Sequence, residues 1–191
     1  MTDSTEREEI HRRQLDLRFY RRKDGLYEVE GSLLDTKTTP FKRPLAVEPT
    51  PAGAAVHDMT LRLVLDESLQ VIDVAAFMRT TPFAICQGAT GTLAGLKGLR
   101  IGPGWNARIR EMFRGNTTCT HLRELLGPMA TTALQGTSQA RVARMKEPGH
   151  ATEHEAKVDS CYAYAGHREV VARLWPHLHR PEPREGQAPG N

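Results

Sequence analysis

The stretch VHDMTLRLVLDESLQVIDVAAFMR, residues 56–79, decides the fold of this chain. Apolar side chains alternate with polar ones at period two from Met59 to Leu65, and Leu69 begins a second apolar series. Asp66-Glu67-Ser68 stands between the two series and is typical of a turn. The stretch therefore predicts an antiparallel hairpin with strands over about 56–65 and 69–79.

A second hairpin is predicted nearer the start of the chain. Apolar and polar residues alternate on either side of Lys23-Asp24-Gly25, and an Asp-Gly pair commonly turns a hairpin. This pattern predicts strands over about 16–22 and 26–34. The segment between the two hairpins is rich in proline, which predicts a linker without regular structure.

Helices are predicted mainly after the two hairpins. They fall near residues 90–96, 106–113 and 121–142, and Pro128 predicts a bend or restart in the longest. A short strand is expected over 158–165, and a strand or helix over 169–174. Hairpins followed by helices favour an α+β fold, with helices packed on one face of an antiparallel sheet. We expect a disordered lead over 1–11, a single domain over 12–175 and a disordered tail over 176–191.

Composition narrows the class of protein. The chain has 191 residues, 39% of them hydrophobic and 26% charged, which is typical of a globular domain. It has no long apolar run and a polar, acidic start, so we expect a cytoplasmic protein with no membrane partner. Its three cysteines are expected to be reduced. A net charge of +3 makes nucleic acid an unlikely partner, whereas a free hairpin edge would allow a homodimer.

The candidate site centres on cysteine and histidine. Cys119 and His121 fall at the predicted start of the long helix, where the backbone N–H groups favour a thiolate. Cys86 follows the second hairpin, and Cys161 falls in the late strand. Thiolate and imidazole suit zinc or iron, so the proposed ligand set is Cys86, Cys119, His121 and Cys161, with His57 as the alternative to Cys161. No Cys-x-x-Cys pair supports this reading.

The same residues allow a mechanism without metal. Cys119 would be a nucleophile, with His57 or His121 as its base. Asp58 would orient the imidazole, although neighbours on a strand point to opposite faces, so direct contact between His57 and Asp58 is not expected. For substrate binding the candidates are Arg62 or Lys37, which would hold a carboxylate, and Trp105, which would line an apolar pocket. Two further acidic residues, Asp35 and Glu124, are interpreted as solvent-facing charges.

A set of short motifs runs from Ile10 to Leu174: Tyr20-Arg21-Arg22, Asp24-Gly25, Asp35-Thr36-Lys37, His57-Asp58-Met59, Arg62, Cys86, Gly98 to Gly104, Cys119-Thr120-His121-Leu122, Glu124-Leu125 and Asp159-Ser160-Cys161. On these motifs, most of the chain resembles an uncharacterised bacterial family catalogued as domain of unknown function 2889. The resemblance implies an association with the catabolism of aromatic or acyl compounds.

A looser resemblance covers residues 58–134, where two strands lead to Cys86 in a glycine-bearing loop and then to Cys119 at a helix start. This order is similar to iron-sulfur cluster scaffold proteins of the IscU and NifU amino-terminal type, and a SufE-like arrangement is equally implied. Such scaffolds hold a metal or cluster with three cysteines and an aspartate or histidine. Here no cysteine lies between Cys86 and Cys119.

The sequence thus favours a lyase or hydrolase that acts on a small aromatic or acyl substrate. One alternative is an iron-sulfur cluster or sulfur-transfer scaffold. Another is a module that binds an anionic partner through the basic run from Arg18 to Lys23.

Overall fold

A computed structural model describes residues 6–144 and 152–181 of the chain. It divides into two compact units, one up to Gly136 and the other from Thr137 onward. The single domain expected over 12–175 spans parts of both units. The outer parts of the expected lead and tail, residues 1–5 and 182–191, lie outside the described residues.

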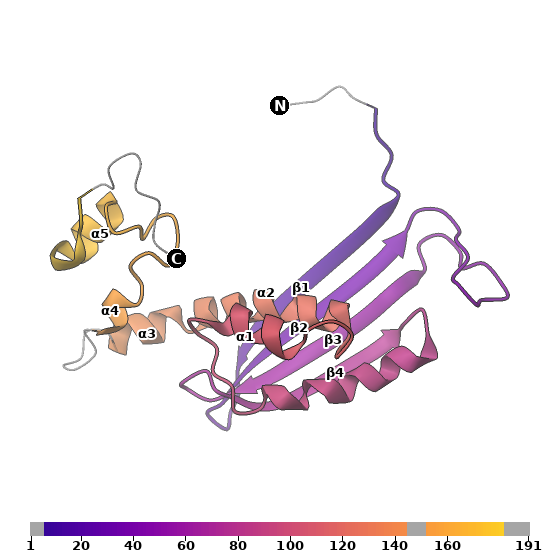
Figure 1. Ribbon diagram of the computed structural model, residues 1–191, viewed down its shortest axis with the longest axis horizontal. Helices are drawn as coiled ribbons and strands as arrows, with labels where there is room; N and C mark the ends of the chain where they lie inside the picture. The colour runs from indigo at the N-terminus through magenta and orange to yellow at the C-terminus, as the bar shows by residue number, and fades with distance from the viewer. Residues whose placement is uncertain (1–5, 145–151, 182–191) are drawn as a thin grey trace. The chain divides into compact units, whose positions relative to one another are not determined.

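The first unit is built on one antiparallel sheet of four strands in the order β1-β2-β3-β4 (Figure 1). The strands are β1 (His11–Arg21), β2 (Tyr27–Lys37), β3 (Ala55–Leu65) and β4 (Val71–Thr80). Each strand pairs with the next in the sequence, so the two predicted hairpins are confirmed and a β2–β3 pairing joins them. The α+β fold class is confirmed as well.

Local chemistry fixes the two tight turns. Gly25 has φ of +86°, a left-handed conformation that glycine adopts without steric cost. In the other turn, the Asp66 carboxylate accepts hydrogen bonds from the backbone N–H groups of Ser68 and Gln70. A side chain that satisfies backbone donors in this way replaces the missing ladder bonds.

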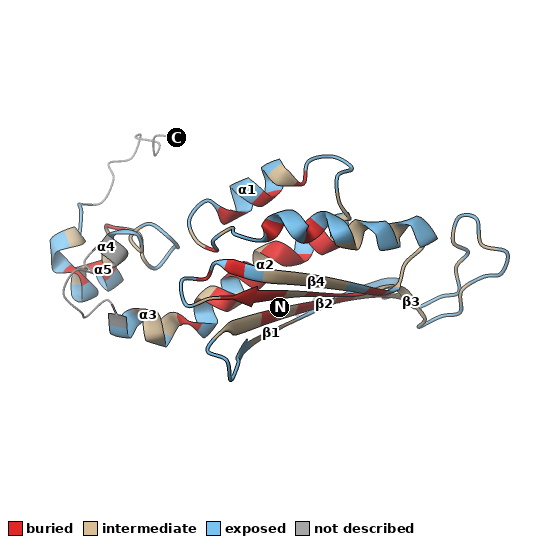
Figure 2. Cartoon of the chain, turned by 90° about the horizontal axis from the view of Figure 1, so that it is seen from below, coloured by how far each residue is buried: buried red, intermediate tan, exposed pale blue. Residues whose placement is uncertain are grey.

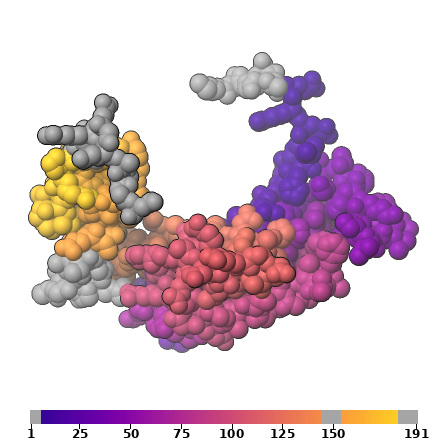
Figure 3. Space-filling view, viewed as in Figure 1, coloured from indigo at the N-terminus to yellow at the C-terminus, as the bar shows by residue number. Residues whose placement is uncertain are grey.

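Helices cover one face of the sheet (Figure 2). They are η1 (Ala84–Leu96), α1 (Trp105–Met112) and α2 (Thr120–Gly136). The space-filling view shows the side chains of these segments spread over the sheet (Figure 3). Between the layers lies an apolar core that includes Leu33, Leu61, Leu63, Leu93, Leu122, Leu125 and Met129, each fully buried.

α2 lies against β1, β2 and β3 and approaches the sheet closely at Gly31. A Cβ atom at Gly31 would stand 2.9 Å from side-chain atoms of both Leu17 and Met129. Of the bend or restart predicted at Pro128, the restart does not occur, because α2 continues through Pro128. Two residues before Pro128, the carbonyl of Leu126 accepts a hydrogen bond from the indole N–H of Trp105 at 3.1 Å.

The second unit contains α3 (Ser138–Arg144), α4 (Thr152–Glu155), α5 (Glu169–Leu174) and η2 (Pro176–Leu178). The strand predicted over 158–165 is wrong, because this segment forms turns. Asp159 has a positive φ there, and its carboxylate accepts the backbone N–H of Gly166. Among the helices of the described residues, none is long and apolar enough to cross a membrane.

Candidate functional site

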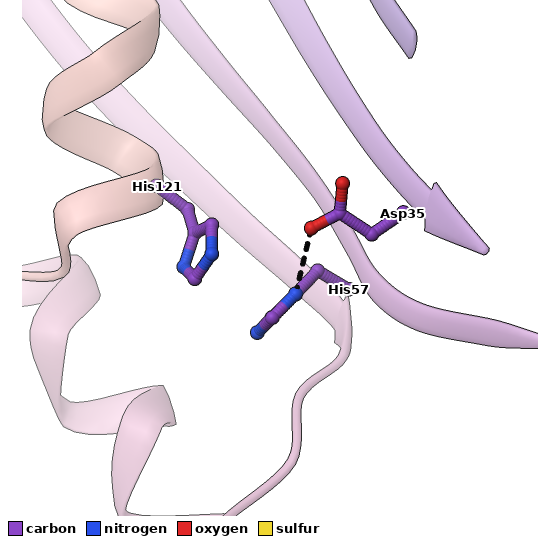
Figure 4. Close-up of side chains that lie close together, drawn as sticks. All are labelled: Asp35, His57 and His121. Atoms are coloured by element: carbon purple, nitrogen blue, oxygen red, sulfur yellow. Dashed lines mark hydrogen bonds and ion pairs between the residues drawn. The ribbon is translucent and has the colours of Figure 1, made fainter. Parts of the chain in front are cut away.

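β2 ends, and β3 and α2 begin, at the same end of the sheet (Figure 1), and polar side chains from these three elements meet there. The close-up shows Asp35 from β2, His57 from β3 and His121 from α2 (Figure 4). Asp35 and His57 are paired directly in the strand register, just before a bulge between Asp35 and Thr36. Odd-numbered positions of these strands face the helices, so both side chains point toward α2.

Asp35 is the buried anchor of the site, with a side chain only 1% exposed. Nε and Nη2 of Arg13 donate to its two carboxylate oxygens, each at 2.8 Å, and Nδ1 of His57 donates to Oδ2 at 2.9 Å. Burial alone would raise the pKa of Asp35, but the hydrogen bonds and charges of Arg13 and His57 outweigh it and lower the pKa to about 2. The carboxylate is therefore ionised at neutral pH.

Arg13 connects the sheet to the helix layer. Its remaining terminal nitrogen, Nη1, donates to Oε2 of Glu124 on α2 at 2.6 Å. One guanidinium from β1 thus holds a carboxylate on β2 and another on α2. Because guanidinium is planar and rigid, this double contact fixes the position of Asp35 relative to the start of α2.

His121 stacks on His57, with ring centroids 3.9 Å apart and an interplanar angle of 35°. Burial first, and then the neighbouring His57 and Arg13, lower the pKa of His121. On the same helix turn, Nδ1 of His121 lies 3.7 Å from Sγ of Cys119. Contacts therefore run without a break from the Cys119 thiol through two imidazoles to the Asp35 carboxylate.

Within the described part of the chain, one set of three side chains could hold a metal ion, namely Asp35, His57 and His121. Each offers one donor atom, and these atoms lie within 4.8 Å of one another. Two imidazoles and one carboxylate suit iron or zinc.

The predicted thiol ligands are placed differently. Cys119 contacts His121 and Cys86 packs against the core, but neither belongs to this set. Cys161 is exposed in the second unit.

The other predicted site residues point elsewhere. Asp58 lies on the opposite face of the sheet and pairs with Arg79 at 2.6 Å, so it does not orient His57. Arg62 is on that face too, 3.9 Å from Glu28.

The two other residues predicted to bind substrate also lie away from the site. The Lys37 ammonium lies 5.6 Å from the centre of the Phe41 ring, and Trp105 is 5% exposed in the core. The structure therefore unites three of the predicted residues, His57, Cys119 and His121.

A family profile described as a protein of unknown function, DUF2889, matches residues 11–135. The chain belongs to the DUF2889 family. The match begins with β1 and ends one residue before α2 ends. It therefore includes all the site residues described above, namely Arg13, Asp35, His57, Cys119, His121 and Glu124. A search of curated proteins and a search of solved structures each found no match. The DUF2889 family description assigns no activity, so the site is interpreted from its chemistry.

Sequence reasoning missed three residues of this DUF2889 site: Arg13, Asp35 and Glu124. The interpretation as a solvent-facing charge is wrong for Asp35, which is buried, whereas Glu124 is exposed, as expected, and pairs with Arg13. A signal for Arg13 was present, because extending the pairing outward from the Asp24-Gly25 turn sets Arg13 opposite Asp35. The sequence held no comparable signal for Glu124, since its contact depends on where α2 docks.

Proposed function

We propose that this DUF2889 protein is an enzyme of hydrolase type that cleaves small acyl substrates, with aromatic acyl groups among them. The observation that carries the proposal is the unbroken set of contacts from Cys119 through His121 and His57 to Asp35. A thiol next to an imidazole is the pair that nucleophilic catalysis uses. Here a second imidazole, hydrogen-bonded to a buried carboxylate, stacks on the first.

Each group has a role that follows from its surroundings. The lowered pKa of His121 keeps its imidazole neutral at pH 7, so Nδ1 can accept the proton of Cys119. The carboxylates of Asp35 and Glu124 favour the charged His121 that results. Asp35 also fixes the tautomer of His57, because an ionised carboxylate only accepts hydrogen bonds and Nδ1 must carry the proton. This leaves Nε2 of His57 as a second site for proton transfer.

The reaction follows from these roles. The sulfur of Cys119 attacks the acyl carbon while its proton passes to His121, and the bond from the acyl carbon to the leaving oxygen or sulfur breaks. His121 gives the proton to the leaving group. Water then attacks the acyl carbon of the thioester while an imidazole accepts a proton from the water. The bond from the acyl carbon to the Cys119 sulfur breaks, the imidazole returns the proton to the sulfur, and the carboxylic acid is released.

The experiment is hydrolysis of a panel of acetyl, octanoyl and benzoyl esters and thioesters by the purified protein. The account expects Cys119→Ser and His121→Gln to lower kcat/KM by roughly 100-fold or more. Glu67→Gln, an exposed change in the β3–β4 turn, is the control and should keep full activity. An active panel member that Cys119→Ser hydrolyses at the wild-type rate would rule out the covalent mechanism.

A metal-dependent enzyme is the second candidate, favoured by the donor atoms of Asp35, His57 and His121 within 4.8 Å of one another. Titration calorimetry with Zn²⁺ on chelator-treated protein tests it directly. Submicromolar binding that is lost in His57→Gln and His121→Gln would support this candidate. The exposed His177→Gln is the matched control. Equal binding by all four proteins would place the ion elsewhere.

A further inference from the structure

A groove separate from the site of Asp35, His57 and His121 lies between the loop after β2 and the segment that joins β4 to η1. It has a volume of about 470 Å³, within the range of small-molecule sites. Pro44 and Leu45 from the loop form one wall, and Pro82, Phe83 and Ile85 form the other. Both segments lie at the end of the sheet where β3 begins (Figure 1).

The walls of the groove expose apolar side chains to water. Leu45 is 94% exposed and Ile85 is 86% exposed. Leu45 also has φ of +67°, a conformation that is costly for a branched residue. Exposed apolar side chains that line one groove are typical of a binding surface, and backbone strain of this kind clusters at such sites.

A guanidinium stands at the polar side of the groove. Arg43 donates through Nε to the hydroxyl of Thr50 at 3.1 Å, and its terminal nitrogens donate to the carbonyls of Thr81 and Ala55 at 3.3 and 3.4 Å. All three acceptors are neutral, and no carboxylate of the described residues forms an ion pair with Arg43. A guanidinium has five N–H donors, so two are left for a ligand.

We propose that this groove binds a small monocarboxylic acid with an apolar body. The carboxylate of the ligand would accept the two remaining N–H groups of Arg43, and its chain or ring would cover Leu45, Phe83 and Ile85. A charge-assisted, two-point contact of this kind is how arginine recognises carboxylates. The choice of a carboxylic acid as the ligand rests on the proposed function, because such an acid is the product of acyl hydrolysis.

Binding is measured by titration calorimetry on the full chain, so the test needs no turnover. The probe is sodium decanoate, compared with acetate, which lacks the apolar body, and with decanol, which lacks the charge. We expect decanoate to bind at least about 10-fold more tightly than either comparison ligand. Equal affinity for decanoate and decanol would overturn the role of Arg43, and no binding of decanoate would overturn the site.

Variants locate the binding. Arg43→Gln should weaken decanoate binding by about 10-fold or more and leave decanol binding unchanged. Because Arg43 also holds the loop, Ile85→Ser is a second variant whose exposed side chain does not support the fold. It should weaken decanoate by at least about 3-fold. Ile72→Ser, an exposed isoleucine of β4 outside the groove, is the matched control.

The two proposals fail separately. Tight, Arg43-dependent decanoate binding without hydrolysis of any ester would keep the groove and remove the hydrolase. Hydrolysis that depends on Cys119, with decanoate binding unchanged in Arg43→Gln and Ile85→Ser, would keep the hydrolase and remove the groove.

Discussion

The carboxylate of Asp35 accepts a hydrogen bond from Nδ1 of His57 at 2.9 Å, between two residues that face each other on neighbouring strands. Arg13 holds the same carboxylate from the other side and reaches Glu124 on α2. A contact between two strands is thereby fixed relative to α2, which carries His121 and begins directly after Cys119. The position of the candidate site is thus set by the sheet register and one guanidinium.

The first prediction compares two aspartates on opposite faces of the sheet. Asp35→Asn leaves the Arg13 charge without its buried partner, so we expect the free energy of unfolding to fall by roughly 3 kcal/mol. Asp58→Asn breaks a largely exposed pair with Arg79 and should cost less than about 1 kcal/mol. Urea unfolding at pH 7 measures both. Equal losses would contradict the burial of Asp35.

The second prediction concerns acid stability. The folded pKa of Asp35, about 2, lies below its ordinary value of 3.8, so the folded protein keeps this carboxylate ionised at pH values where the unfolded chain binds a proton. The resulting stability, about 2 kcal/mol, is fully present above pH 4 and is lost as pH falls toward 2. Urea unfolding from pH 5 to pH 2.5 should show a steeper loss for wild type than for Asp35→Asn. Parallel curves would contradict the assignment.

The third prediction tests the contact between α2 and the sheet. Gly31→Ala places a methyl group 2.9 Å from Leu17 and Met129, so the helix or these side chains must move. We expect a loss of about 1–3 kcal/mol in the free energy of unfolding. Gly88→Ala is a control, because a Cβ there meets nothing within 4 Å. A neutral Gly31→Ala would mean that the layers pack more loosely than described.

The sheet could be predicted from the sequence because each hairpin shows period-two alternation and one turn signal, Asp24-Gly25 in the first and Asp66-Glu67-Ser68 in the second. The first strand was predicted too short, since His11 to Asp16 are exposed and mostly polar and join the sheet through backbone pairing. Proline favours a break in the helix at Pro128, yet α2 continues through it with its apolar residues buried. The turns over 158–165 depend on Asp159, whose role is visible only in the structure.

The site could be predicted only in part. His57, Cys119 and His121 stood out as residue types that carry chemistry. Asp35 did not, because a polar residue on a hairpin gives no local sign of burial. Asp35 and His57 pair on strands that are joined by the long proline-rich loop between β2 and β3. A tight turn sets the register of the strands on either side of it, but a loop of this length does not.

The most direct test of the central claim, that His121 activates Cys119, is competitive alkylation. Chelator-treated protein is exposed to iodoacetamide at pH 7, and the modified peptides of Cys86, Cys119 and Cys161 are quantified by mass spectrometry. The account predicts that half-buried Cys119 reacts roughly 10-fold faster than exposed Cys161. His121→Gln should abolish the difference, and because the pKa of His121 is lowered, the advantage should persist below pH 6.5. Reactivity that follows exposure alone, with Cys161 fastest and Cys119 unchanged in His121→Gln, would contradict the account.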